Sequence, residues 1–167
     1  MKRRNFLKNT AATVTFLSSG LINFSCKEKE KKITILHTND VHSHIFPLSN
    51  NDKKRANLGG VARRSVIINK IRKENPNTLL LDAGDIFQGT PYFNYFGGEL
   101  EFKLMSLLKY DASTIGNHDF DNGIEGFNKV LHHAKFPFIC SNYDFSNTIL
   151  KDKTEPFTIK KYGALKV

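Results

Sequence analysis

Short apolar runs recur along the chain, and each is followed by a polar segment. These runs cover residues 33–36, 78–81, 111–115 and 136–141. Their length and apolar character predict buried strands. The run Thr78-Leu79-Leu80-Leu81 does not alternate with polar residues, which is typical of a strand covered on both faces of a sheet. Weak alternation over residues 156–162 predicts an outer strand, and Ala164 starts another.

Segments with helical spacing separate the apolar runs. A first helix is expected between Gly60 and Asn75, with apolar residues over a broad face. A second helix is expected over residues 99–109 and a third over residues 123–134. The predicted buried positions of the last two are Leu100, Leu104, Leu107, Leu108, Ile124, Phe127, Val130 and Leu131. The alternation of strands and helices predicts an α/β fold with a parallel sheet.

Composition and charge limit the classes of function. The 167 residues are enough for one domain with its own core. The net charge is +9, but Lys2, Arg3, Arg4 and Lys8 supply part of it in an N-terminal segment without acidic residues. The other basic residues are spread along the chain, with no stripe of Arg and Lys interleaved with aromatic residues. Binding to a nucleic-acid polymer is therefore not expected.

Residues 1–25 predict an export signal. The basic start Lys2-Arg3-Arg4 precedes an uncharged, moderately apolar stretch over residues 11–24, which is too short and too polar for a stable membrane span. The sequence Arg3-Arg4-Asn5-Phe6-Leu7-Lys8 resembles the twin-arginine consensus, which directs export. We therefore expect the protein to leave the cytoplasm.

Cys26 follows the export signal directly and is typical of a lipoprotein processing site. Lipidation of Cys26 would make the product a lipid-anchored protein of the periplasm or cell envelope, with residues 26–32 as a solvated tether of alternating charge. The alternative is a plain secretory signal with an incidental cysteine. Cys140 lies in an apolar run and is predicted to be a small buried core residue.

Three polar segments follow three of the predicted strands. They are Asp40-Val41-His42, Gly84-Asp85 and Gly116-Asn117-His118-Asp119. Polar groups at the carboxyl ends of parallel strands meet at one edge of the sheet, where such folds build their sites. Aspartate, histidine and asparagine together are ligands for divalent metals, so these segments predict a metal centre.

Each segment has a specific chemical role and a simpler alternative. Asp40 and His42 would point the same way on an extended segment and could ligate one ion, although for so short a motif taken alone a solvated loop is much the more common explanation. Asp85 could bridge two metals or cap a helix. Asn117 offers a neutral oxygen or forms a turn. His118 could donate a hydrogen bond to a phosphoryl or leaving-group oxygen, with a carboxylate fixing its tautomer.

In their order and spacing, the three segments resemble the signature of the calcineurin-like metallophosphoesterases. The longer strings are similar to those of the 5′-nucleotidase and UDP-sugar hydrolase branch, with the match extending over residues 33–145. They read Ile35-Leu36-His37-Thr38-Asn39-Asp40-Val41-His42-Ser43-His44, Gly84-Asp85-Ile86-Phe87-Gln88-Gly89-Thr90-Pro91 and Gly116-Asn117-His118-Asp119-Phe120-Asp121. The resemblance implies an α/β/β/α sandwich, of which this chain would supply the first half.

The resemblance also implies a dinuclear metal site. Asp40 and His42 would hold one ion, Asp85 would bridge both, and Asn117 would hold the second. His118 and Asp121 would form the catalytic pair, with Asp121 orienting His118. The donor set suits Zn²⁺, Mn²⁺ or Fe²⁺. The implied reaction is hydrolysis of nucleotide phosphoesters by water activated at the two metals, with 2′,3′-cyclic nucleotides or nucleotide sugars as alternative substrates.

The chain departs from the family pattern in one respect. In the family, further histidines downstream in the sequence complete the metal site. Nothing after His133 can fill those positions, and His132 and His133 fall on the third helix, where we expect surface residues. Of the early histidines, His37 is expected in the core and His44 near the site entrance. Residues 33–167 are therefore expected to be the N-terminal part of a longer catalytic domain. The non-enzymatic alternative is an inactive, truncated metal-binding lipoprotein, and the sequence assigns no oligomeric state.

Overall fold

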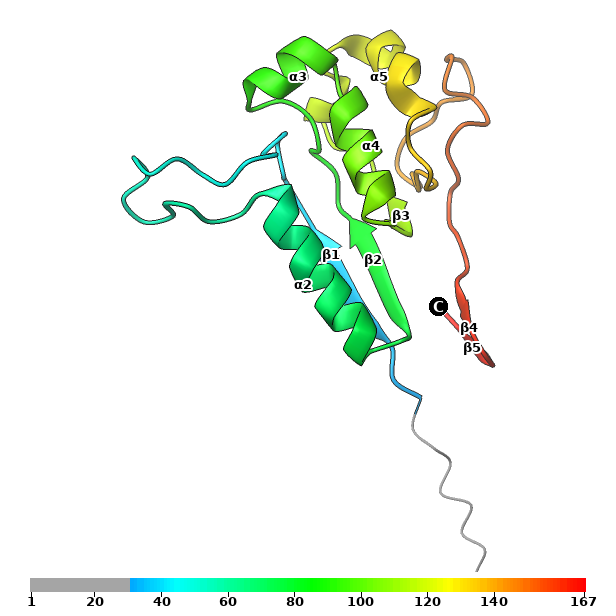
Figure 1. Cartoon of the computed structure of the whole chain (residues 1–167). Coiled ribbons are helices and arrows are strands. Elements are labelled where there is room, and N and C mark those ends of the chain that lie inside the picture. The colour runs from blue at the N-terminus through cyan, green and yellow to red at the C-terminus, as the bar shows by residue number, and fades with distance from the viewer. Residues whose placement is uncertain (1–30) are drawn as a thin grey trace, which may run out of the picture. The chain divides into compact units, whose positions relative to one another are not determined.

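The computed structural model describes residues 31–167, so the predicted export signal and nearly all of the tether lie outside the described residues. Its central element is a parallel sheet with strand order β1-β2-β3. The strands are β1 (Thr34–Thr38), β2 (Thr78–Asp82) and β3 (Ala112–Ser113), and Thr34 pairs with Thr78 in register. The predicted α/β class with a parallel sheet is confirmed (Figure 1).

The three predicted helices are present as α2 (Val61–Glu74), α4 (Glu99–Leu107) and α5 (Gly123–Leu131). Two shorter elements were not predicted, α3 (Pro91–Phe96) and the 3₁₀ helix η1 (His118–Phe120). The short α3 has proline in its first turn and ends at Gly97, whose left-handed backbone (φ 58°) closes the helix. Six residues are too few for a helical repeat to be visible in the sequence.

Helices cover one face of the sheet. Leu80 of β2 packs into the same buried cluster as Ile68 of α2, Phe102 of α4 and Phe127 of α5. Phe102 lies among aromatic rings, with the Phe87 ring centroid 4.8 Å away. Side chains alternate between the faces of a strand, so the next residues along β1 and β2 point to the opposite side.

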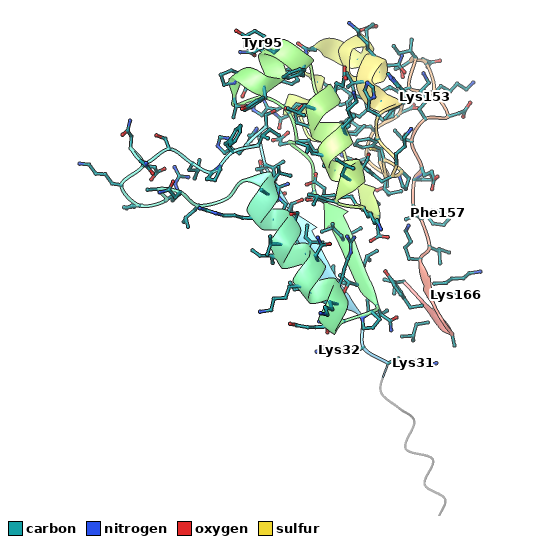
Figure 2. The ribbon with its side chains drawn as sticks, viewed as in Figure 1. Lys31, Lys32, Tyr95, Lys153, Phe157 and Lys166 are labelled. Carbon is teal, nitrogen blue, oxygen red and sulfur yellow. The ribbon has the colours of Figure 1, made fainter. Side chains whose placement is uncertain are left out.

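The opposite face is only partly covered. Ile35 is 55% exposed, and His37 is also exposed, so the prediction of a core position for His37 is wrong. Leu79 is buried as predicted, and a cavity of about 390 Å³ separates this side of β2 from the C-terminal segment around Phe157. Figure 2 shows Phe157 on that segment, which runs beside the sheet toward the C-terminus.

The buried faces of α4 and α2 differ from the prediction. In α4, Leu107 is 76% exposed and Leu100 and Leu104 are only half-buried, whereas Glu101, Phe102 and Met105 are buried. The helix is turned so that the aromatic side chain of Phe102 enters the core in place of these three leucines, whereas Leu108, directly after the helix, is buried as predicted. In α2 only Ile68 is buried, and Val66 and Ile67 are exposed, so the broad buried face was also wrong. In α5 the predicted Phe127 and Val130 are buried.

The C-terminal strands are shorter than predicted. Residues 136–141 form only isolated bridges, one from Phe138 to Ser113 and one from Ile139 to Glu155, although Cys140 is buried as expected. A separate antiparallel pair follows, β4 (Lys161–Tyr162) and β5 (Leu165–Lys166). None of the helices in the described part of the chain combines the length and apolar character needed to cross a bilayer.

Candidate metal centre

The loop after β1 lies against the loop after β2. Backbone N–H groups of Asp40 and His42 donate to the carbonyls of Gly84 and Asp85, both at 3.1 Å. Asp40 and His42 both have left-handed backbones (φ 50° and 44°), so the extended geometry expected for this motif is wrong. A turn, held by the neighbouring loop, brings the two side chains to the same place.

Asp40, His42 and Asp85 come together into one cluster of ligand atoms. One ligand atom from each lies within 4.8 Å of the others, and His42 Nε2 is 3.6 Å from Asp40 Oδ1. His42 Nδ1 is 3.1 Å from the carbonyl oxygen of Phe87. A carbonyl only accepts, so Nδ1 carries the proton and Nε2 is left free to bind a metal. Two carboxylates and one free imidazole nitrogen fit a divalent cation.

The third polar segment is attached to this cluster through Asp85. The backbone N–H of His118 donates to Asp85 Oδ1 at 2.9 Å, which places Asn117, the residue before it, beside Asp85. Two glycines make this approach possible. A Cβ on Gly116 would lie 2.1 Å from Asp85 Oδ1, and a Cβ on Gly84 would lie 2.6 Å from the Gly116 nitrogen. Any larger residue at either position would push the two loops apart.

His118 and Asp121 form the predicted pair at the rim of the cluster. His118 Nδ1 lies 3.0 Å from Asp121 Oδ2 and 3.3 Å from Oδ1. The hydrogen bond to Asp121 raises the pKa of His118 above its ordinary value of 6.5. The His118 and His42 rings are neighbours, with centroids 5.3 Å apart. Because Nδ1 is bound to Asp121, Nε2 is the atom of His118 that can meet a substrate.

Asp119 supports the site from below, a role that the sequence did not reveal. It is 1% exposed and accepts backbone N–H bonds from Gly116, Asp85, Ile86 and Phe87 at 2.8–3.1 Å. Burial raises the pKa of Asp119 to about 6, while the backbone bonds from Gly116, Phe87 and Ile86 act in the opposite direction. One carboxylate thus joins the loops after β2 and β3.

Asp82 is a second buried carboxylate beneath the site. It ends β2 and accepts hydrogen bonds from the backbone of Gly84 at 2.9 Å, from the Ser113 hydroxyl at 3.2 Å and from the Thr38 hydroxyl. Its partners belong to or follow all three strands of the sheet. Burial raises the pKa of Asp82, and the bond from Thr38 is the largest effect opposing it. The only sequence signal for this residue is a carboxylate at the end of an apolar run.

The remaining histidines lie outside the metal cluster. His44 is exposed on the loop after β1. His132 Nδ1 is 3.0 Å from the Lys129 carbonyl, and His133 Nε2 is 3.7 Å from Glu99. Within residues 31–167, Asp40, His42 and Asp85 are the only group of three acidic, histidine or cysteine residues close enough to share an ion. That His132 and His133 are not metal ligands stays a prediction.

The likeness to known proteins covers most of the chain. The sequence profile for calcineurin-like phosphoesterases matches residues 33–163. The 5′-nucleotidase of Rattus norvegicus is 47% identical over 119 residues, which are 68% of this chain and 21% of the relative. The snake venom 5′-nucleotidase of Crotalus adamanteus is 41% identical over 143 residues, which are 81% of this chain and 24% of that protein.

Solved structures share the fold at moderate sequence identity. The 5′-nucleotidase precursor of Thermus thermophilus is 36% identical with a TM-score of 0.73, over 80% of this chain and 27% of that one. The NAD nucleotidase of Haemophilus influenzae is 36% identical with a TM-score of 0.72, over 80% of this chain and 25% of that one. The chain spans about a quarter of the length of these two structures. Together with the strand-end cluster, these matches show that the chain belongs to the calcineurin-like phosphoesterase family.

Proposed function

We propose that this chain carries the first part of the active site of a metal-dependent hydrolase that releases phosphate from nucleotides. The observation that carries the proposal is the meeting of Asp40, His42 and Asp85 within 4.8 Å, beside the hydrogen-bonded pair His118–Asp121. A metal cluster alone is common in proteins. A cluster with a histidine whose free nitrogen lies at its rim matches the needs of phosphoester hydrolysis.

The proposed ligand roles follow the donor atoms. Asp40 and His42 would hold one divalent ion, Asp85 would contribute to both ions, and Asn117 would contribute its amide oxygen to the second. Carboxylate, imidazole and amide donors together favour Zn²⁺, Mn²⁺ or Fe²⁺. Two such ions, when bound, lower the pKa of a water and balance charge on the attacking and leaving oxygens. The remainder of the chemistry belongs to residues of the chain.

His118 is the proposed catalytic residue, because its Nε2 can donate a hydrogen bond to a phosphoryl or leaving-group oxygen. The Asp121 carboxylate accepts a hydrogen bond from Nδ1–H at 3.0 Å, which fixes the ring orientation, and Nε2 donates when the ring is protonated. In the metal-free protein the same bond raises the pKa of His118, which favours the protonated ring. A protonated imidazole is the better donor to an oxygen that gains negative charge.

Nucleotides are the substrate class that the relatives favour. Two of them are a 5′-nucleotidase and an NAD nucleotidase, and both names specify action on a nucleotide. The test uses protein expressed from the complete gene, loaded with Mn²⁺ or Zn²⁺. Phosphate release is measured from a nucleoside 5′-monophosphate, a 2′,3′-cyclic nucleotide and a nucleotide sugar. We expect release from the 5′-monophosphate, and little release from a variant with His42→Ala.

Two outcomes would contradict this proposal. Equal release by the wild type and the His42→Ala variant would separate the activity from the cluster. Metal binding without hydrolysis of any of the three substrates would favour a metal-binding protein without enzymatic activity. Faster release from the cyclic nucleotide or the nucleotide sugar would support hydrolase activity but would contradict the 5′-monophosphate as the substrate.

We also propose export and lipid anchoring, which rest on residues outside the described part of the chain. The twin-arginine-like start at Arg3-Arg4 and the placement of Cys26 support the proposal. Labelling cells with a radioactive fatty acid tests it, with Cys26→Ser as the control. We expect label on the wild type alone. A wild-type protein that is exported without label would contradict lipid anchoring and support the plain secretory signal.

A further inference from the structure

A small cavity with a mostly apolar lining lies behind the loop that carries Asp40 and His42. Its volume is about 20 Å³, and its polar lining residues are Ser43 and His44 of that loop, Arg64 of α2 and Glu101 of α4. Apolar side chains, including those of Ile86 and Met105, close the remainder. Roughly 10–15 Å³ is enough to hold one water molecule. The cavity therefore has room for one water and for nothing larger.

Glu101 is the unusual member of this cavity wall. It is 3% exposed, and neither carboxylate oxygen has a hydrogen-bond partner within the described residues. The Oγ of Ser43, which is 1% exposed, likewise has no partner in that part of the chain. Buried polar groups are nearly always hydrogen-bonded, and an isolated buried carboxylate is far costlier than a hydroxyl. Three unpartnered oxygens around one cavity indicate a shared partner.

Arg64 supplies the opposite charge in the same wall. Its Nη1 is 3.4 Å from the Tyr110 hydroxyl, a long hydrogen bond that leaves its other N–H groups available. No direct ion pair joins Arg64 and Glu101 in the part of the chain that the structure describes. A water between them would donate to the carboxylate and accept from the guanidinium or the Ser43 hydroxyl. Such a bridge satisfies all three groups.

We propose that the cavity is a site for one ordered water that bridges Glu101, Ser43 and Arg64. Through this water, Glu101 acts as a positioning residue for the loop that carries Asp40 and His42. The water site stands on the cavity alone, whereas the effect on metal binding rests on the proposed function. Glu101 is not itself proposed to contact metal or substrate.

The loop after β1 needs such support because its backbone is strained. Asp40, His42 and Ser43 all have positive φ, at 50°, 44° and 53°. Residues other than glycine are disfavoured in this region, so the conformation persists only where the surroundings hold it. Ser43 is held by its N–H to the Ile86 carbonyl at 2.8 Å and by the Thr90 hydroxyl at 2.9 Å. The water would add a third attachment, to α2 and α4.

The first test is a high-resolution crystal structure of the protein from the complete gene. We expect one peak with the density of water, within hydrogen-bond distance of Glu101 and Ser43 Oγ. In Glu101→Leu the same peak should be missing. A guanidinium of Arg64 in direct contact with Glu101, without a peak between them, would overturn the water site. A peak with the short distances of a metal cation would overturn it as well.

The second test measures Mn²⁺ affinity by electron paramagnetic resonance, below the unfolding temperature of every variant. Glu101→Leu should weaken Mn²⁺ binding by about 10–100-fold, the range found when residues behind metal ligands are removed. Glu101→Gln keeps an oxygen and an N–H for the water, so it should recover most of the affinity. Glu99→Leu, on the same helix but exposed, should bind Mn²⁺ as the wild type does.

A stability control separates positioning from general destabilisation. Leu150→Ala removes a fully buried side chain that lines neither the cavity nor the metal cluster. It should lower the unfolding temperature without changing Mn²⁺ affinity. Equal loss of affinity in Leu150→Ala and Glu101→Leu, or unchanged affinity in Glu101→Leu, would overturn the positioning role. Failure of the wild type to bind Mn²⁺ would instead contradict the proposed function, and the crystallographic test of the water would still apply.

Discussion

The rim of the candidate site and the layer beneath it use the same kind of side chain in opposite ways. At the rim, Asp121 is exposed and its carboxylate contacts His118. Two residues earlier, Asp119 is 1% exposed and accepts four backbone N–H bonds. The rim carboxylate can act on a group that meets substrate, whereas the buried one determines the course of two loops. Exposure to solvent, more than residue type, separates the two roles.

The difference also shows how the loops reach their geometry. Beneath the site, Asp119 binds backbone groups of the loops after β2 and β3, and Gly116 allows Asp85 to lie directly against it. At the rim, Asp40 and His42 have strained left-handed backbones that the neighbouring loop holds in place. The buried layer therefore pre-organises ligands that the rim alone would not hold.

The largest expected effect comes from removing Asp85 at the rim. Asp85→Ala should abolish binding of both metal ions and, with it, phosphate release, because Asp85 is the carboxylate proposed to contact both. Elemental analysis of the purified variant measures the metal content. Asp144→Ala, at an exposed position outside the cluster, should keep the content of the wild type. Retention of two ions by Asp85→Ala would remove its bridging role.

Removing His118 should affect turnover without affecting metal content. His118→Ala is expected to lower kcat by about 10²–10⁴-fold, the usual contribution of a positioned proton donor. The metal ligands of the cluster are untouched, so two ions per chain should remain. Steady-state kinetics and elemental analysis on the same preparation check both statements, with His132→Ala as the matched control. Wild-type kcat in His118→Ala would exclude the assigned role.

A matched pair of substitutions tests the contrast between Asp119 and Asp121. In Asp119→Asn an amide nitrogen replaces one oxygen and leaves two buried N–H groups without an acceptor. At about 1–3 kcal/mol for each unsatisfied donor, the free energy of unfolding should fall by about 2–6 kcal/mol. Asp121→Asn, at an exposed position, should change it by less than about 0.5 kcal/mol. Urea unfolding of the metal-free proteins measures both, and equal losses would show that burial does not separate the two roles.

The smallest expected effect is a pKa change at the rim. In the metal-free protein, the hydrogen bond that His118 donates to Asp121 raises the pKa of His118 above 6.5, and Asp121→Asn should lower it toward that value. A raised folded-state pKa contributes stability below 6.5, and this contribution is lost as the pH rises through the folded-state pKa. NMR titration of the His118 ring measures the shift. An unchanged pKa in Asp121→Asn would contradict the pairing.

Much of the fold could be predicted from the sequence because apolar runs and helical spacing report directly on burial. The strands β1 and β2 and the helices α2, α4 and α5 were found in this way. The errors arose where packing overrides spacing. In α4 the aromatic ring of Phe102 enters the core, which leaves Leu107 exposed. His37 lies on a face of β1 that is open to solvent, which no local pattern reveals.

Some residues of the candidate site could likewise be predicted from the sequence, and others could not. The rim residues from Asp40 to Asp121 could be named because their order resembles a family signature, and the structure brings Asp40, His42 and Asp85 together. The supporting residues could not be named. Asp119 reads as a turn former and Glu101 as a charged surface position of a helix, since burial and hydrogen bonding depend on contacts between distant segments. The sequence also suggested an extended loop where the backbone is left-handed.

Anomalous diffraction from crystals grown with Mn²⁺ tests the central claim most directly, because it locates the metal without reference to activity. We expect an anomalous peak in contact with a carboxylate oxygen of Asp40, Nε2 of His42 and a carboxylate oxygen of Asp85. No peak should remain there in His42→Ala crystals grown at the same Mn²⁺ concentration. A peak elsewhere, such as beside His132 and His133, with none at the Asp40–His42–Asp85 cluster would contradict the account.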